Sequence, residues 1–150
     1  MTTMPSSAIG AIREASRDGE KGFATAADDA SRPDLKELFR DCSVQRANFG
    51  RELDRRLRMM GVEEDESGTV TGALHRGWIE LRAAVSNGGD LALLEECLRG
   101  DESALASFQT AIEDPDVTGE LHDLVVSQRQ DIQATFNHIS SIKADFNAHR

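Results

Sequence analysis

Several residue types that mark other classes of protein are scarce in this chain. Among its 150 residues there is no tyrosine, and there are only 3 prolines, 2 cysteines and 1 tryptophan. Runs of β-branched residues and strict alternation of apolar and polar residues are nearly absent, so the pattern does not predict β-strands. No apolar run approaches the roughly 20 residues that a membrane-spanning helix needs. These scarcities favour an all-α protein that does not insert into a membrane.

The net charge and the cysteines indicate which partners and which cell compartment to expect. A formal net charge of -10 repels phosphates, which argues against nucleic acid and anionic lipid as partners. The N-terminus lacks the basic start and apolar block of a secretory signal peptide, which predicts a cytoplasmic protein. Cys42 and Cys97 have no CxxC spacing and fall on apolar helix faces. We expect two reduced, buried thiols, and a disulfide is the alternative.

Apolar residues recur at alternating three- and four-residue steps through most of the chain, the pattern of helices that bury one face. Pro33 suits the first turn of a helix, where a missing N–H costs nothing, and Gly61 suits the position just past a helix end. Asp90 can cap the helix that follows it. The pattern predicts four long helices over residues 6–30, 33–60, 90–113 and 118–146.

A shorter amphipathic segment lies between the second and third long helices. Val70, Trp78 and Val85 share one face, and the segment ends at the Asn-Gly-Gly stop of residues 87–89. We predict a short extra helix there, within a long crossover. The other two connections are short and make antiparallel neighbours. The fold prediction is a single all-α domain over residues 1–150, a four-helix bundle of two antiparallel hairpins with a long crossover, which is the ferritin-like arrangement.

Each long helix interrupts its apolar stripe near the middle with a polar residue: Glu20, Gln45, Asp101 and Gln128 in chain order. In an antiparallel hairpin, residues equidistant from the turn lie at the same height. The first pair is centred on the turn before Pro33, and the second pair between Asp114 and Pro115. We therefore expect all four polar side chains to share one layer of the core.

Two more polar residues, Asn48 and Asp131, follow Gln45 and Gln128 on the same helix faces at i+3. Di-iron bundles use Glu, Glu-x-x-His, Glu and Glu-x-x-His at such positions, whereas this chain lacks the histidines and has two amides. Because buried carboxylates need a compensating cation or protons, this layer is a candidate for a degenerate polar or divalent-metal site. Oxygen donors suit Mg²⁺, Ca²⁺ or Mn²⁺ better than redox iron, Fe. The alternative is a polar network that fixes helix register without metal. The candidate ligands are Glu20, Gln45, Asn48, Asp101, Gln128 and Asp131.

A resemblance to a known family is carried by four segments, DGEKGF (18–23), QRANF (45–49), GALHRGWIELR (72–82) and LEECLRGDE (94–102). Together they resemble the ferritin-like four-helix-bundle family of unknown function that is common in Proteobacteria. The resemblance spans most of the chain and implies a ferritin-like fold with a metal site, but no established activity. Relatives tend to carry glutamates where this chain has Leu98 and Asp101, and an aromatic hydroxyl in place of Phe108. These departures argue against oxidative di-iron chemistry.

Two functions fit these patterns. The favoured hypothesis is a non-enzymatic bundle that acts through its surface or through assembly into a homo-oligomer, in a stress or cell-envelope response. The alternative is a metal-binding protein of the di-iron or di-manganese type, an oxidoreductase or a metal-handling protein, that uses Glu20, Asp101 and Asp131. Neither a nucleophile–base pair nor a phosphate-binding glycine loop is visible in the sequence, so we predict no catalytic residue.

Overall fold

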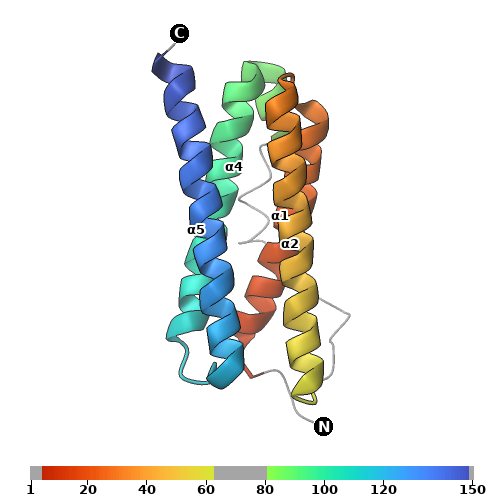
Figure 1. Ribbon diagram of the computed structural model, residues 1–150, viewed down its shortest axis with the longest axis vertical. Helices are drawn as coiled ribbons and strands as arrows, with labels where there is room; N and C mark the ends of the chain where they lie inside the picture. Colours follow the sequence, from red (N-terminus) through yellow and green to blue (C-terminus); the bar gives the residue numbers. More distant parts are fainter. Residues whose placement is uncertain (1–4, 63–80, 149–150) are drawn as a thin grey trace.

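The computed structural model describes residues 5–62 and 81–148, and in these ranges the protein is an all-α four-helix bundle (Figure 1). The described residues form no β-strand. The periodicity of the sequence predicts the ends of the long helices to within two residues, apart from the start of the third. The helices are α1 (Ser7–Asp29), α2 (Pro33–Met59), α4 (Leu81–Glu113) and α5 (Gly119–Ala148).

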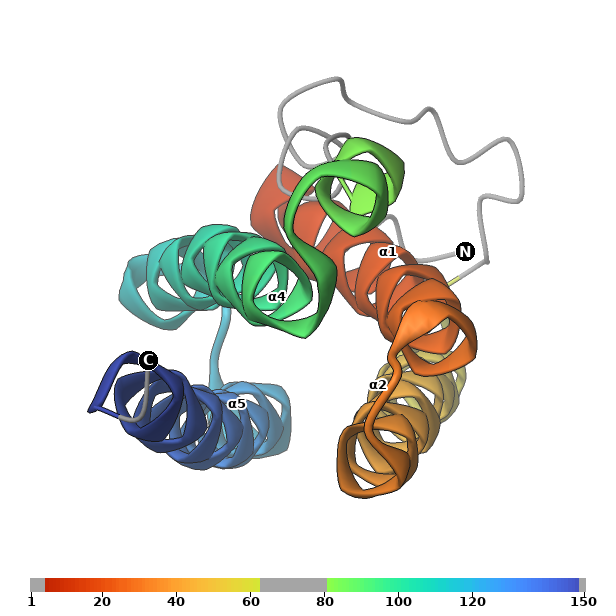
Figure 2. The same ribbon diagram turned by 90° about the horizontal axis from the view of Figure 1, so that it is seen from above.

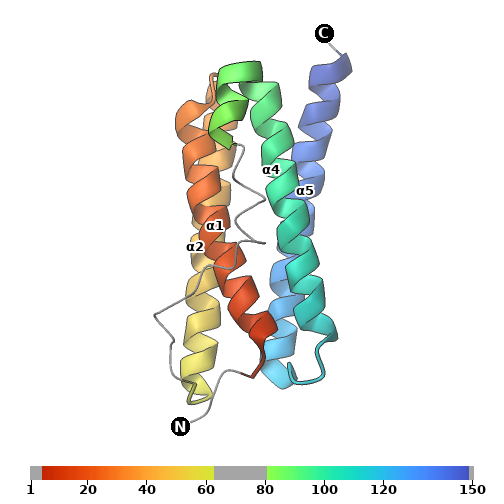
Figure 3. The same cartoon turned by 180° about the vertical axis from the view of Figure 1, so that it is seen from behind.

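The four helices stand at the corners of a square when seen along the bundle (Figure 2). α1 packs against both α2 and α4, α4 packs against α5, and α2 and α5 pack least closely. α2 and α4 are therefore diagonal neighbours across the core. α1 and α5 run in one direction, and α2 and α4 run in the other (Figure 1). This arrangement makes two antiparallel hairpins, α1/α2 and α4/α5, and places α1 beside α4 (Figure 3).

Local signals in the sequence set the ends of the first two helices. Ser6 precedes α1, and its hydroxyl oxygen accepts a hydrogen bond of 3.0 Å from the Ala8 N–H, which satisfies one of the donors that a helix start leaves free. Pro33 occupies the first turn of α2. Gly61 follows the end of α2 with φ of 79°, a left-handed conformation that glycine adopts without strain. The predictions for Pro33 and Gly61 are confirmed.

The start of α4 differs from the prediction. Residues 81–88 are helical, and the helix is interrupted at Gly89, which has φ 60° and ψ -143°. Asp90 was expected to cap its own helix, but its carboxylate accepts hydrogen bonds from the backbone N–H groups of Ser31 (2.7 Å) and Arg32 (3.1 Å). Asp90 thus connects α4 to the α1–α2 turn, because its carboxylate accepts from two backbone N–H groups of that turn.

The predicted crossover lies mostly outside the described residues. The short helix was expected over Val70 to Val85. Its part up to residue 80 lies outside the described residues, and the rest forms the first segment of α4. The end of α2 and the start of α4 lie at opposite ends of the bundle (Figure 1), as a long crossover requires. No helix in the described ranges is both long enough and apolar enough to cross a membrane.

The core consists of two apolar clusters stacked along the bundle. One cluster is built around the buried side chains of Ile12, Leu53 and Phe108. The other contains Phe23 and Phe39, whose ring centroids are 6.1 Å apart. Cys42 and Cys97 belong to the second cluster, and both are buried and free, as expected of reduced thiols. The candidate site lies between the two clusters.

Candidate functional site

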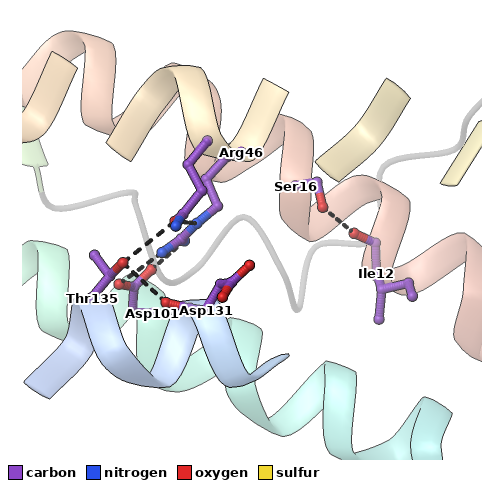
Figure 4. Close-up of polar contacts among 7 residues, drawn as sticks. Ile12, Ser16, Arg46, Asp101, Asp131 and Thr135 are labelled. Atoms are coloured by element: carbon purple, nitrogen blue, oxygen red, sulfur yellow. Dashed lines mark hydrogen bonds and ion pairs between the residues drawn. The ribbon is translucent and has the colours of Figure 1, made fainter. Parts of the chain in front are cut away.

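A layer of buried polar side chains separates the two apolar clusters. Ser16, Arg46, Asp101 and Gln128 are each 2% exposed or less, and each comes from a different helix. The Ser16 hydroxyl donates a hydrogen bond of 2.9 Å to the carbonyl oxygen of Ile12 in its own helix. Ser16 is therefore satisfied locally and does not reach toward the other three helices (Figure 4).

An ion pair between Arg46 and Asp101 forms the centre of the layer. Arg46 is 1% exposed and Asp101 is 0% exposed. Two guanidinium nitrogens of Arg46 donate to the two carboxylate oxygens of Asp101, over 2.5 and 3.2 Å. The pair (Figure 4) joins α2 to α4, which lie diagonally across the bundle (Figure 2). A parallel two-bond contact of this kind is the strongest arrangement available to arginine and a carboxylate.

Neighbouring side chains accommodate both the charge and the length of the Arg46 side chain. Its Nε donates a hydrogen bond of 3.1 Å to the Gln45 side-chain oxygen, and its guanidinium carbon lies 5.1 Å from the centre of the Phe23 ring, within the range of a cation–π contact. Gly19 leaves room for the aliphatic part of the side chain, because a Cβ there would lie 3.1 Å from the Arg46 Cγ. Thr135 from α5 contacts the same Gln45 oxygen at 3.4 Å.

The electrostatics of Asp101 follow from its complete burial. Burial raises the pKa of Asp101, because the charged form loses its hydration. The charge and hydrogen bonds of Arg46 oppose this rise. A buried pair of this kind contributes little net stability, but loss of one partner leaves the other uncompensated. The layer therefore depends on both residues together.

Three of the six predicted metal ligands are exposed to solvent. Glu20, Asn48 and Asp131 lie on outer helix faces, so the prediction that Glu20 belongs to the core layer is wrong. The stripe of α1 passes through Gly19 instead, because the bulk of Arg46 needs the space beside it. Asn48 accepts a surface hydrogen bond of 2.6 Å from Arg51.

The other three predicted ligands lie in or beside the layer but not around one point. Asp101 and Gln128 are buried, and Gln45 is half-buried. The predicted level of Gln128 is wrong by about one helical turn: its side-chain NH₂ donates over 3.2 Å to the carbonyl oxygen of Phe49, which lies three residues beyond Arg46. The reason is the length of the turn, since residues 114–118 connect α4 to α5. The turn is centred on residue 116, so Asp101 is level with Asp131 rather than with Gln128.

A divalent metal does not fit this layer. Both oxygens of Asp101 are used by Arg46, and the two other predicted carboxylates, Glu20 and Asp131, are exposed. The side-chain oxygen of Gln128 has no hydrogen-bond partner among the described residues, but one amide oxygen is not a metal site. Within residues 5–62 and 81–148, no group of three or more His, Cys, Asp or Glu could hold a metal ion.

Arg46 is the central residue that the sequence pattern did not identify. The stripe of α2 can pass from Cys42 to Phe49 through either residue 45 or residue 46, because both choices give alternating steps of three and four. Arginine is almost never fully buried without a partner, so periodicity alone does not favour residue 46. The signal that could have found Arg46 was the small Gly19 at the same level of α1 together with a carboxylate at Asp101.

The fold and this layer define a class of protein: an all-α four-helix bundle with a buried arginine–aspartate pair in its core. The particular family follows from the sequence comparisons. The family model described as Domain of unknown function (DUF2383) matches residues 4–114, which is more than half of the chain, and the chain belongs to that family. The match includes α1, α2, α4, Arg46 and Asp101 and ends before α5. No curated protein matches the chain significantly.

Proposed function

We propose that this protein is a ferritin-like bundle without enzymatic activity, in which a guanidinium supplies the central positive charge that a metal supplies in di-iron bundles. The observation that carries the proposal is the ion pair of Arg46 and Asp101, both fully buried, with both carboxylate oxygens occupied. The argument for a metal was that a buried carboxylate needs a cation. Arg46 balances the charge of Asp101 and occupies both of its oxygens, so the carboxylate is not available to bind a metal ion.

Metal loading tests this proposal directly. Protein purified without chelator is incubated with Fe²⁺ or Mn²⁺, desalted and measured by elemental analysis. We expect less than about a tenth of an equivalent of either metal, because no preformed set of ligands competes with hydration of the ion. One equivalent or more that survives desalting would contradict the proposal.

The metal-binding alternative, a di-iron or di-manganese oxidoreductase or metal-handling protein, makes a different prediction for the same assay. It requires that Glu20→Ala and Asp101→Asn both abolish binding, whereas Glu95→Ala leaves binding unchanged. Glu20 and Glu95 are both exposed, so the pair of variants is matched in charge and solvent access. Under our proposal all three variants and the parent protein give the same low metal content.

We further propose that the protein acts by binding through its surface, including to a second copy of itself. Large apolar side chains that the described structure exposes are Val44 (56%), Met59 (67%) and Met60 (40%), and all three lie on or directly after α2. Because isolated exposed apolar residues are common, self-association through these three side chains is tested in solution. Sedimentation equilibrium over a wide concentration range should show association that Val44→Glu with Met59→Glu abolishes and Glu95→Ala does not. A monomer at every concentration would refute self-association.

A further inference from the structure

Cys42 and Cys97 lie on the two helices that face each other across the diagonal of the core. α2 and α4 run in the same direction (Figure 1), so a contact between them fixes the level of every other pair. The Arg46–Asp101 ion pair is such a contact. Each cysteine lies four residues before its member of the ion pair, which is one helical turn along the same helix face. The two thiols are therefore at one level, and both belong to the same buried cluster.

Ordinary helix spacing places the two cysteines at or beyond the upper limit for a disulfide, a separation suitable for one bridging atom. Neighbouring helix axes are about 8–10 Å apart, so diagonal axes are roughly 11–14 Å apart and Cα atoms that face across roughly 7–9 Å apart. A disulfide needs Cα atoms within about 7 Å. A metal between two thiolates, with bonds of about 2.3 Å as in zinc sites, places the sulfurs about 4.6 Å apart. Arg46 spans the same diagonal because its side chain is long.

A cleft reaches one member of this pair, Cys42, from solvent. A cavity of about 270 Å³ opens between α2 and α5, and Cys42 is one of its lining residues, with Asp41 and His138 among the others. α2 and α5 are also the neighbours that pack least closely (Figure 2). The same cleft thus presents a carboxylate, an imidazole and the Cys42 thiol to an entering ion. The formal net charge of -10 favours the approach of cations.

From this geometry we propose that Cys42 and Cys97 form a two-thiolate site for one soft monovalent metal ion, with Cu⁺ as the biological example, which enters through the α2–α5 cleft. Soft thiolate ligands select Cu⁺ over hard cations. Two ligands leave a tetrahedral ion such as Zn²⁺ incomplete within a closed apolar core. Binding replaces two S–H protons by one ion: two thiols and Cu⁺ give a bis-thiolate complex of charge -1 and two released protons, one turn away from the internally neutral Arg46–Asp101 pair.

The state of the free thiols restricts the site to strongly thiophilic ions. Burial raises the pKa of Cys42 to about 12 and that of Cys97 well above its usual value; the charge of Asp101 adds to both rises, and the charge of Arg46 opposes them. Both residues are therefore neutral thiols at neutral pH, and a metal must displace their protons to bind. This site is separate from the arginine–aspartate layer, so its test does not depend on the Fe²⁺ and Mn²⁺ experiment.

Competition with a colorimetric Cu⁺ chelator tests the site. Reduced protein is titrated anaerobically with Cu⁺ in the presence of bicinchoninate. We expect one equivalent to bind, and binding more than about 100-fold weaker in Cys42→Ser and in Cys97→Ser, because each removes half of the ligands. The matched control is His122→Gln, which removes a solvent-accessible imidazole that does not line the cleft and should leave the affinity unchanged.

Further measurements keep the proposal refutable if a serine variant folds poorly. X-ray absorption of the Cu⁺-loaded parent protein should show two sulfur ligands, and circular dichroism should confirm that each variant is helical. Retained affinity in folded Cys42→Ser, nitrogen or oxygen ligands, or half an equivalent bound with a doubling of mass would each overturn the proposal. A Cys42–Cys97 disulfide that forms readily with a thiol oxidant would also overturn it, because the sulfurs would then be too close.

Discussion

Removal of the Arg46 guanidinium should destabilise the fold more than any single surface change. In Arg46→Met the side chain keeps most of its apolar length, but Asp101 loses both hydrogen bonds and stays fully buried. Breaking a buried pair by removing one partner costs about 3–5 kcal/mol. For a chain of this size we expect a fall in Tm of roughly 2–4 °C for each kcal/mol. Urea unfolding followed by circular dichroism measures the free energy directly.

The loss should depend on pH in a defined direction. Burial raises the pKa of Asp101 above its ordinary 3.8, and Arg46 opposes the rise; without Arg46 the rise is larger. A carboxyl whose folded-state pKa is raised contributes full stability below the unfolded pKa and loses it as the pH rises through the folded pKa. The gap between Arg46→Met and the parent protein should therefore be smaller at about pH 5 than at about pH 8.

Two further variants separate loss of charge balance from loss of packing. Arg51→Met removes an exposed arginine from the same helix and should change stability by less than about 0.5 kcal/mol. The double variant Arg46→Met with Asp101→Leu removes both charges, and it should recover most or all of the stability because apolar replacements of a buried pair are neutral or stabilising. A change below about 1 kcal/mol in Arg46→Met, or no recovery in the double variant, would refute the assignment of this pair.

Two smaller perturbations test the local geometry. Gly50→Ala, where a new Cβ meets nothing within 4 Å, should stabilise α2 by about 0.5–1 kcal/mol. Gly19→Ala should stabilise less or destabilise, because its Cβ would lie 3.1 Å from the Arg46 Cγ. Equal gains in the free energy of unfolding, measured with urea, would contradict this packing. Ser6→Ala should raise the pKa of Asp114 in an NMR titration, since the hydrogen bond from Ser6 is the main cause that lowers it, and an unchanged pKa would show that this bond does not form in solution.

The positions of the helices could be predicted, apart from the start of α4, because the other helix ends have local causes. Pro33 begins α2, Gly61 follows its end, and the Asp-Pro-Asp break ends α4 at Glu113. The apolar periodicity also identified the buried face of each helix. These features depend on residues a few positions apart, which a single sequence displays directly.

The composition of the polar layer could not be predicted in the same way. It depends on the choice between Gln45 and Arg46 on α2, and between Gly19 and Glu20 on α1, and each choice changes the facing direction by about 100° without breaking the stripe. It also depends on the length of the turn at residues 114–118. An error of one or two residues in the centre of that turn moves Gln128 by a full helical turn relative to Asp101.

The layer becomes interpretable when the two diagonal helices are compared rather than the two hairpins. Parallel helices keep a constant difference in residue number at each level, so the pair Arg46–Asp101 also pairs Cys42 with Cys97. Side chains at one level must match in both size and charge: the long Arg46 requires the small Gly19 beside it and an acid opposite. A glycine on one helix, an arginine on the next and an aspartate on the diagonal helix are therefore the combination by which a sequence of this kind can reveal a charged core.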